Sequence, residues 1–230
     1  VRVTWSSQSV ANIFLRIQAF VTSARLNLAT METVILHSCC APCSAAVLEW
    51  MLAHDIRPVV FYFNPNIFPQ AEYEKRKNEL TAHCQKLGVE VVDGDWDHNA
   101  WLDAVKGLEN EPERGRRCTV CFSVRLRAAA KLAHDRGIAR FTTTLASSRW
   151  KNLDQVNAAG REAAAQHDNV QYWDKNWRKD GLQDRRNALL KFYGFYNQTW
   201  CGCEFSYRDA QKRAAEIASR ISAQSNKTSI

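Results

Sequence analysis

The sequence between positions 33 and 43 reads Thr33-Val-Ile-Leu-His-Ser-Cys39-Cys40-Ala-Pro-Cys43. A short run of apolar and β-branched residues such as 33–38 predicts a buried strand. Pro42 suits the first turn of a helix, where a missing backbone N–H leaves no hydrogen bond unmade, and residues 45–54 continue as helix. We therefore expect a strand that ends directly in a loop of cysteines, followed by a helix.

The rest of the chain continues this alternation of strands and helices. Further strands are predicted at residues 58–63, 89–92 and 140–145, and helices at residues 71–87, 97–107, 119–137, 152–166 and 180–193, with a terminal helix to residue 222. Such alternation through short connections predicts an α/β fold with a parallel sheet flanked by helices and a helical C-terminal part. Ligands bind beyond the carboxyl ends of such strands, where residues 39–43, 64–69 and 147–149 would lie.

Length and composition fit one folded unit. The chain has 230 residues, of which 46% are hydrophobic and 24% charged, which is typical of a globular domain. Residues 1–30 contain three arginines and no acid and directly precede Met31, so we interpret them as an N-terminal extension outside the native fold. Residues 31–230 are then expected to form a single α/β catalytic domain. No run of eighteen apolar residues occurs, so we expect no membrane span and a cytoplasmic protein.

The charge of the chain is unevenly distributed. The net charge is +7, and residues 112–140 contain eight Arg or Lys residues against two acids. A basic face of this kind fits a polyanion such as nucleic acid, although a merely solvated face explains the same charge.

Seven of the eight cysteines fall into three tight groups, which are Cys39-Cys40-Ala-Pro-Cys43, Cys118-Thr-Val-Cys121 and Cys201-Gly-Cys203. A secreted disulfide scaffold is disfavoured at this length without a signal peptide, which leaves metal or redox chemistry. Adjacent cysteines can bind separate irons of one cluster, so the spacing favours a [4Fe–4S] cluster held by Cys39, Cys40, Cys118 and Cys121. A zinc site built from two of the groups is the alternative.

The pair Cys201-Gly-Cys203 is of a different kind. A disulfide across C-x-C closes a very small, strained ring and is easily reduced. This pair therefore suits an electron relay, or ligands of a second metal, better than a structural crosslink. The eighth cysteine, Cys84, lies in a helical pattern and is expected to be a core thiol.

Five motifs occur in unbroken order between residues 33 and 207. They are Leu36-His-Ser-Cys39-Cys40-Ala-Pro-Cys43, Asn64-Pro-Asn-Ile-Phe-Pro69 with Glu72-Tyr73, Cys118-x-x-Cys121-Phe122 with Arg125, Phe141-Thr-Thr-Thr-Leu-Ala-Ser147, and Tyr196-Asn-Gln-x-x-Cys201-Gly-Cys203. Together they resemble the QueH family of epoxyqueuosine reductases.

This resemblance implies a Rossmann-like sheet related to the adenine-nucleotide alpha-hydrolase group. It also implies a cobalamin-independent enzyme that reduces the epoxide of epoxyqueuosine at the tRNA wobble position, giving queuosine. The partners would be a tRNA with a GUN anticodon and an electron donor that the sequence does not identify.

The resemblance assigns roles to the cysteines as well. It implies a [4Fe–4S] cluster on Cys39, Cys40, Cys118 and Cys121 and a redox-active, catalytic pair at Cys201 and Cys203. Some members hold an additional iron beside the cluster. One of its ligands would be the residue at position 43, which is acidic in some relatives and is Cys43 here.

Two other functions remain open from the residues alone. Cys40-Ala-Pro-Cys43 between a strand and a helix is similar to a thioredoxin-type site, but a thioredoxin-like disulfide oxidoreductase would leave the other two cysteine groups without a role. A zinc-stabilised RNA-binding module would explain the charge and the cysteines without catalysis. If the protein acts on tRNA, a splayed anticodon base could stack on Phe68, Trp150 or Trp177.

Overall fold

The computed structural model describes residues 31–227, so the expected extension at residues 1–30 lies outside the described residues. Within the described part, five parallel strands form one sheet in the order β3-β2-β1-β4-β5. The strands are β1 (Glu32–His37), β2 (Ile56–Tyr62), β3 (Glu90–Asp93), β4 (Arg140–Thr143) and β5 (Gln171–Tyr172). This is the order of the first five strands in a doubly wound sheet.

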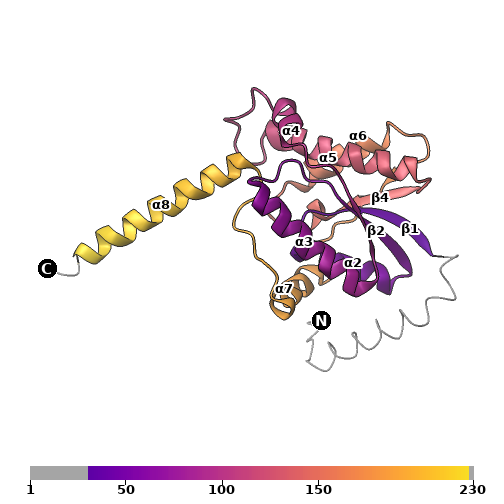
Figure 1. The fold of residues 1–230 in the computed structure, drawn as a ribbon, viewed down its shortest axis with the longest axis horizontal. Coiled ribbons are helices and arrows are strands. Elements are labelled where there is room, and N and C mark those ends of the chain that lie inside the picture. The colour runs from indigo at the N-terminus through magenta and orange to yellow at the C-terminus, as the bar shows by residue number, and fades with distance from the viewer. Residues whose placement is uncertain (1–30, 228–230) are drawn as a thin grey trace.

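Helices cover both faces of the sheet (Figure 1). Contacting helices α2 (Ala41–Ala53), α3 (Gln70–Leu87) and α7 (Leu182–Tyr193) lie on one side, and α5 (Arg116–Asp135) packs with α6 (Leu153–Ala164) on the other. The short α4 (His98–Ala104) contacts α5, and α8 (Glu204–Lys227) extends away from the sheet. The predicted α/β fold is therefore confirmed. Across residues 31–227, no helix has the length and apolar character needed to cross a membrane.

The central strand explains why the cysteines lie where they do. Val34, Ile35 and Leu36 of β1 are fully buried, since β1 pairs with β2 and β4 and helices cover its two faces. The strand order reverses between β1 and β4, and doubly wound sheets bind ligands at the carboxyl ends of the strands beside such a switch point. The first cysteine group follows β1 and therefore lies at this switch point.

Several element boundaries differ from the predicted ones. The strand predicted at residues 140–145 ends at Thr143, and a short 3-10 helix, η2 (Thr144–Ser147), follows it. The Thr143 hydroxyl accepts a hydrogen bond from the Leu145 backbone N–H at 3.1 Å, and this turns the chain out of the sheet. Helix α5 begins at Arg116 rather than at residue 119, so Cys118 and Cys121 both lie on it. Strand β5 is too short to show a pattern in the sequence.

A buried histidine in α3 predicts how stability depends on pH. His83 is 3% exposed, its ring packs against Tyr193 and Phe195, and neither ring nitrogen has a hydrogen-bond partner among the described residues. Burial, with a smaller effect of Lys86, lowers the pKa of His83 from 6.5 to about 4. Between those pH values the unfolded chain binds a proton that the folded chain does not, so stability falls as the pH falls.

We expect His83→Phe to remove this part of the acid sensitivity, because a phenyl ring fills the same aromatic site without titrating. The wild type should lose up to about 3 kcal/mol more than the variant between pH 6.5 and pH 4. Urea midpoints measured across that range test the prediction. Parallel pH profiles for the two proteins would contradict it.

Candidate functional site

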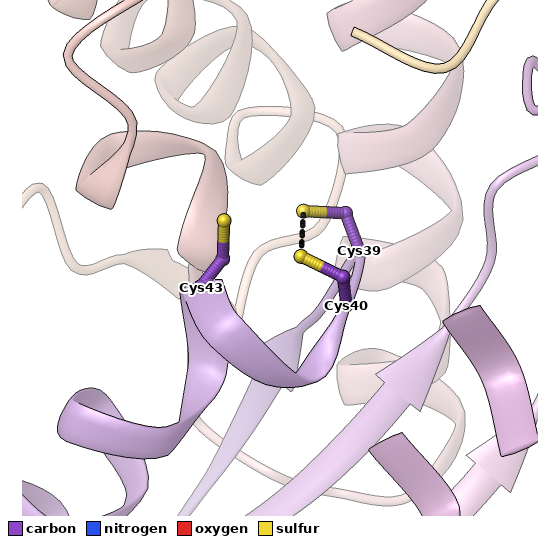
Figure 2. A group of neighbouring side chains, drawn as sticks. All are labelled: Cys39, Cys40 and Cys43. Atoms are coloured by element: carbon purple, nitrogen blue, oxygen red, sulfur yellow. Dashed lines mark hydrogen bonds between the residues drawn. The ribbon is translucent and has the colours of Figure 1, made fainter. Parts of the chain in front are cut away.

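Three cysteines from the loop after β1 and the first turn of α2 bring their sulfur atoms together (Figure 2). The sulfurs of Cys39, Cys40 and Cys43 all lie within 4.8 Å of one another, and those of Cys39 and Cys40 are 3.8 Å apart. Cys40 is the N-cap of α2, and Pro42 in its first turn lets the helix start immediately beyond the strand. The local sequence thus forces this group of thiols together without help from distant segments.

Hydrogen bonds among the three thiols separate their pKa values. Hydrogen bonds from Cys40 and Cys43 hold the pKa of Cys39 well below its usual range, although burial acts against this. Hydrogen bonds with Cys39 and with Cys43 raise the pKa of Cys40. The hydrogen bond with Cys39 raises the pKa of Cys43 to about 12. Soft, converging sulfur atoms of this kind are the ligands that iron–sulfur clusters and zinc prefer. The three sulfur atoms therefore fit either an iron–sulfur cluster or a zinc ion.

Cys118 and Cys121 lie one turn apart at the start of α5, so that both are on one side of the helix. The Cys118 sulfur accepts a hydrogen bond from the Arg114 backbone N–H at 3.2 Å, and Cys121 is buried. Burial raises the pKa of both thiols, and the charge of Cys201 raises it further. This second pair is therefore a neighbour of the C-x-C segment.

The C-x-C segment lies over α3 and is held there by a buried ion pair. Arg76, 3% exposed, binds Glu72 at 2.6 Å and donates to the backbone carbonyl of Cys201 at 3.3 Å. Gly202 has a φ of +125°, and a Cβ at this position would come within 3.0 Å of Arg76 Nη1, so glycine is required here. Cys203 packs in a small apolar cluster that also contains Cys121. Cys201 and Cys203 are both free thiols in this structure.

Lys151 connects the cysteine groups electrostatically. Its ammonium lies 3.4 Å from the Cys201 sulfur. Burial would lower the pKa of Lys151, but the charges of Cys201 and Cys39 outweigh burial and raise it above its usual value. The charge of Arg125, whose Nε donates to the Cys121 carbonyl at 3.1 Å, acts in the opposite direction and lowers the pKa of Lys151. Lys151 thus links the C-x-C segment with the cysteine group that follows β1.

The sequence analysis did not identify Lys151, although it placed residues 147–149 at the same edge of the sheet. Only the location of Lys151 just after residues 147–149 pointed to a role, because many loop lysines have no function. Among the described residues, Cys39, Cys40 and Cys43 form the one group of three or more potential ligands within 4.8 Å. The structure adds neither Cys118 nor Cys121 to this group, and it packs Cys121 with Cys203 in a separate apolar cluster.

Other predicted residues are placed more clearly. Cys84 is fully buried in α3, where burial raises its pKa to about 12, so its prediction as a core thiol is confirmed. Trp177 was wrongly considered for base stacking, since it is 1% exposed and donates its indole N–H to Thr142. Trp150, by contrast, is 66% exposed. Phe68 is partly buried and stacks on His98.

Comparisons with known proteins agree with the motifs of the sequence. The family model described as "Epoxyqueuosine reductase QueH" matches residues 34–209. Relatives named epoxyqueuosine reductase QueH include one from Haemophilus influenzae, 47% identical over 78% of this chain and 73% of the relative. Others are from Acinetobacter baylyi, 43% identical over 79% and 83%, and Thermotoga maritima, 34% identical over 82% and 97%.

Solved structures match as well, among them the U34-tRNA thiolase NcsA from Methanococcus maripaludis with its [4Fe-4S] cluster. It is 12% identical, with a TM-score of 0.44 over 86% of this chain and 70% of that chain, a similarity too low to carry an argument about the site. The family match rests instead on the sequence, since it covers β1 through the start of α8 and every cysteine of the site. The chain belongs to the epoxyqueuosine reductase QueH family of oxidoreductases.

Proposed function

We propose that this protein reduces the epoxide of epoxyqueuosine at the wobble position of tRNA to an alkene, giving queuosine. The observation that carries the proposal, beside membership of the family, is that Lys151 interacts with Cys201 and with Cys39 and Cys43, while Cys121 packs with Cys203. Three cysteine groups linked in this way exceed what one structural zinc needs, and they fit redox chemistry with two kinds of centre.

In this proposal Cys39, Cys40, Cys118 and Cys121 hold a [4Fe–4S] cluster, and Cys43 is a candidate ligand of an additional iron. When bound, the cluster supplies single electrons. The fit rests on the donor set, since the first two sulfurs are 3.8 Å apart and the latter two lie on one side of α5. Cys43 lies within 4.8 Å of Cys39 and Cys40, close enough to share a metal centre with them.

Cys201 and Cys203 form the proposed redox pair. Reduction of an epoxide to an alkene consumes two electrons and two protons and releases one water molecule. A dithiol that closes to a disulfide releases two electrons and two protons, so the pair balances one turnover. The strained C-x-C ring then favours return to the dithiol when an external donor supplies two electrons.

The substrate in the proposal is a tRNA with a GUN anticodon that carries epoxyqueuosine. Residues 31–230 are proposed to act as one catalytic domain in the cytoplasm, with an electron donor that remains to be identified. Of the basic residues at 112–140, Arg114 lies just before α5, and its backbone N–H donates to the Cys118 sulfur, so an RNA backbone would approach the site at this end of the helix. Arg117 and Arg125 are buried, and Arg140 lies in β4.

The test is an anaerobic assay of the reconstituted protein on epoxyqueuosine-containing tRNA with a chemical reductant. We expect queuosine to form, and we expect a brown protein with broad absorption near ~400 nm, as thiolate-bound iron–sulfur clusters show. A colourless protein that contains zinc and no iron would contradict the cluster and favour the RNA-binding module. Disulfide reductase activity without queuosine formation would favour the thioredoxin-like function.

A further inference from the structure

An exposed tryptophan stands beside the cysteine site. Trp150 is 66% exposed, the most exposed large apolar side chain among the described residues. It directly precedes Lys151, whose ammonium contacts the Cys201 sulfur. A large exposed aromatic ring next to a reactive site offers a flat apolar face on which a ligand can stack.

The backbone of this tryptophan is fixed by two arginines. Arg114 Nε donates to the Trp150 carbonyl at 2.8 Å, and Arg178 Nη2 donates to the Lys151 carbonyl at 2.9 Å. The Arg114 backbone N–H in turn donates to the Cys118 sulfur. Trp150 is therefore held at a constant position relative to the thiols, as a docking platform requires.

The same place concentrates positive charge without balancing acids. Among the described residues, none of the ion pairs includes Arg114, Arg149, Lys151 or Arg178. Burial and the nearby charge of Arg114 lower the pKa of Arg178, which shows that like charges face one another here. Unpaired arginines gathered in this way are typical of a site for phosphate.

One face of the tryptophan is already stacked. The Arg149 guanidinium lies 4.9 Å from the centre of the Trp150 ring, in cation–π geometry. Bases of single-stranded RNA bind proteins by stacking on such aromatic rings, while arginines next to the ring hold the backbone phosphates. The chemistry of this surface fits a nucleotide more closely than it fits a protein, because it combines one flat apolar ring with several cations.

We propose that Trp150 stacks on a base of the tRNA anticodon loop, and that Arg114, Arg149 and Arg178 bind the adjoining phosphates, so that the wobble nucleoside enters the cysteine site. This inference rests on the proposed function, since it takes its RNA from that function. It adds the residues that bind the RNA and the place on the protein where the anticodon loop docks.

The test measures RNA affinity separately from turnover. The probe is a labelled anticodon stem-loop RNA with an unmodified guanosine at the wobble position, titrated with the reconstituted protein and followed by fluorescence anisotropy. We expect Trp150→Ala to weaken binding roughly 5- to 150-fold, and Trp150→Phe to restore most of the affinity, because loss of one stacked base has this magnitude. Arg149→Ala should reduce the slope of log Kd against log salt by about 0.7, since one phosphate contact is lost.

Phe192→Ala is the matched control, because Phe192 is 59% exposed on α7 and packs edge-on against Tyr193, outside the cationic cluster. Its RNA affinity should equal that of the wild type. Equal RNA affinity in Trp150→Ala and the wild type would overturn the docking proposal, and slower turnover by that variant at saturating tRNA would assign the surface to the electron donor. A wild type that binds RNA through Trp150 but forms no queuosine would contradict the proposed function and leave the docking surface supported.

Discussion

Replacement of Arg76 by methionine should destabilise the protein by about 3–5 kcal/mol and abolish most of its activity. The guanidinium is 3% exposed and pairs with Glu72, which is 7% exposed, so the variant leaves a buried carboxylate without its partner. Arg76 also donates to the backbone carbonyls of Cys201 and Trp200, so its loss releases the segment that carries the C-x-C pair. Urea unfolding and the queuosine assay measure the two effects.

A double variant separates the effect of Arg76 on protein stability from its effect on the position of the C-x-C segment. Glu72→Met with Arg76→Met removes both charges, so we expect much of the stability to return, as apolar replacement of a buried ion pair is often neutral. Activity should stay low, because the carbonyl of Cys201 still lacks its donor. Equal recovery of stability and activity would show that Arg76 acts only through folding.

A surface ion pair on the same helix supplies the control. Lys77 contacts Asp93 at 2.5 Å, but the two side chains are 26% and 50% exposed. Lys77→Met should therefore cost no more than about 1 kcal/mol, because water screens an exposed pair. A cost for Lys77→Met as large as that for Arg76→Met would contradict the assignment of the effect to burial.

Cys203→Ser should lower turnover on epoxyqueuosine-containing tRNA on the order of 10²-fold or more, because a serine cannot close the proposed disulfide and a required redox step is lost. Cys203 is 8% exposed and packs with Cys121, so the similar size of serine keeps the local packing. Iron content should stay that of the wild type, since the proposal places Cys203 outside the cluster. Single-turnover assays and iron analysis are made on the same preparation.

Cys84→Ala is the matched control for loss of a buried thiol. Cys84 is fully buried in α3, belongs to the main hydrophobic core and is in none of the three cysteine groups. Its replacement should reduce stability slightly and leave turnover and iron content unchanged. Full activity in Cys203→Ser would remove the relay role from the pair and leave the cluster proposal standing. Loss of iron in that variant would instead make Cys203 a ligand.

The sequence predicted the sheet because its signals are local. The apolar run at residues 33–38 and the proline after Cys40 both act within a few residues, so the strand, the cysteine loop and the helix start were all recognisable. The boundaries at Thr143 and Arg116 were missed because each depends on a particular hydrogen bond or on a neighbouring segment. Strand β5 was missed because two residues carry no periodicity.

The chain by itself determined that three cysteine groups exist and that redox or metal chemistry follows, because close spacing along the backbone forces neighbouring sulfurs together. Only the tertiary structure decided what surrounds them. Lys151 approaches Cys201 across fifty positions, and Arg76 reaches the same segment from α3 across 125 positions. Such contacts depend on how helices pack on the sheet. Burial then decides their strength, because charge interactions gain strength away from water.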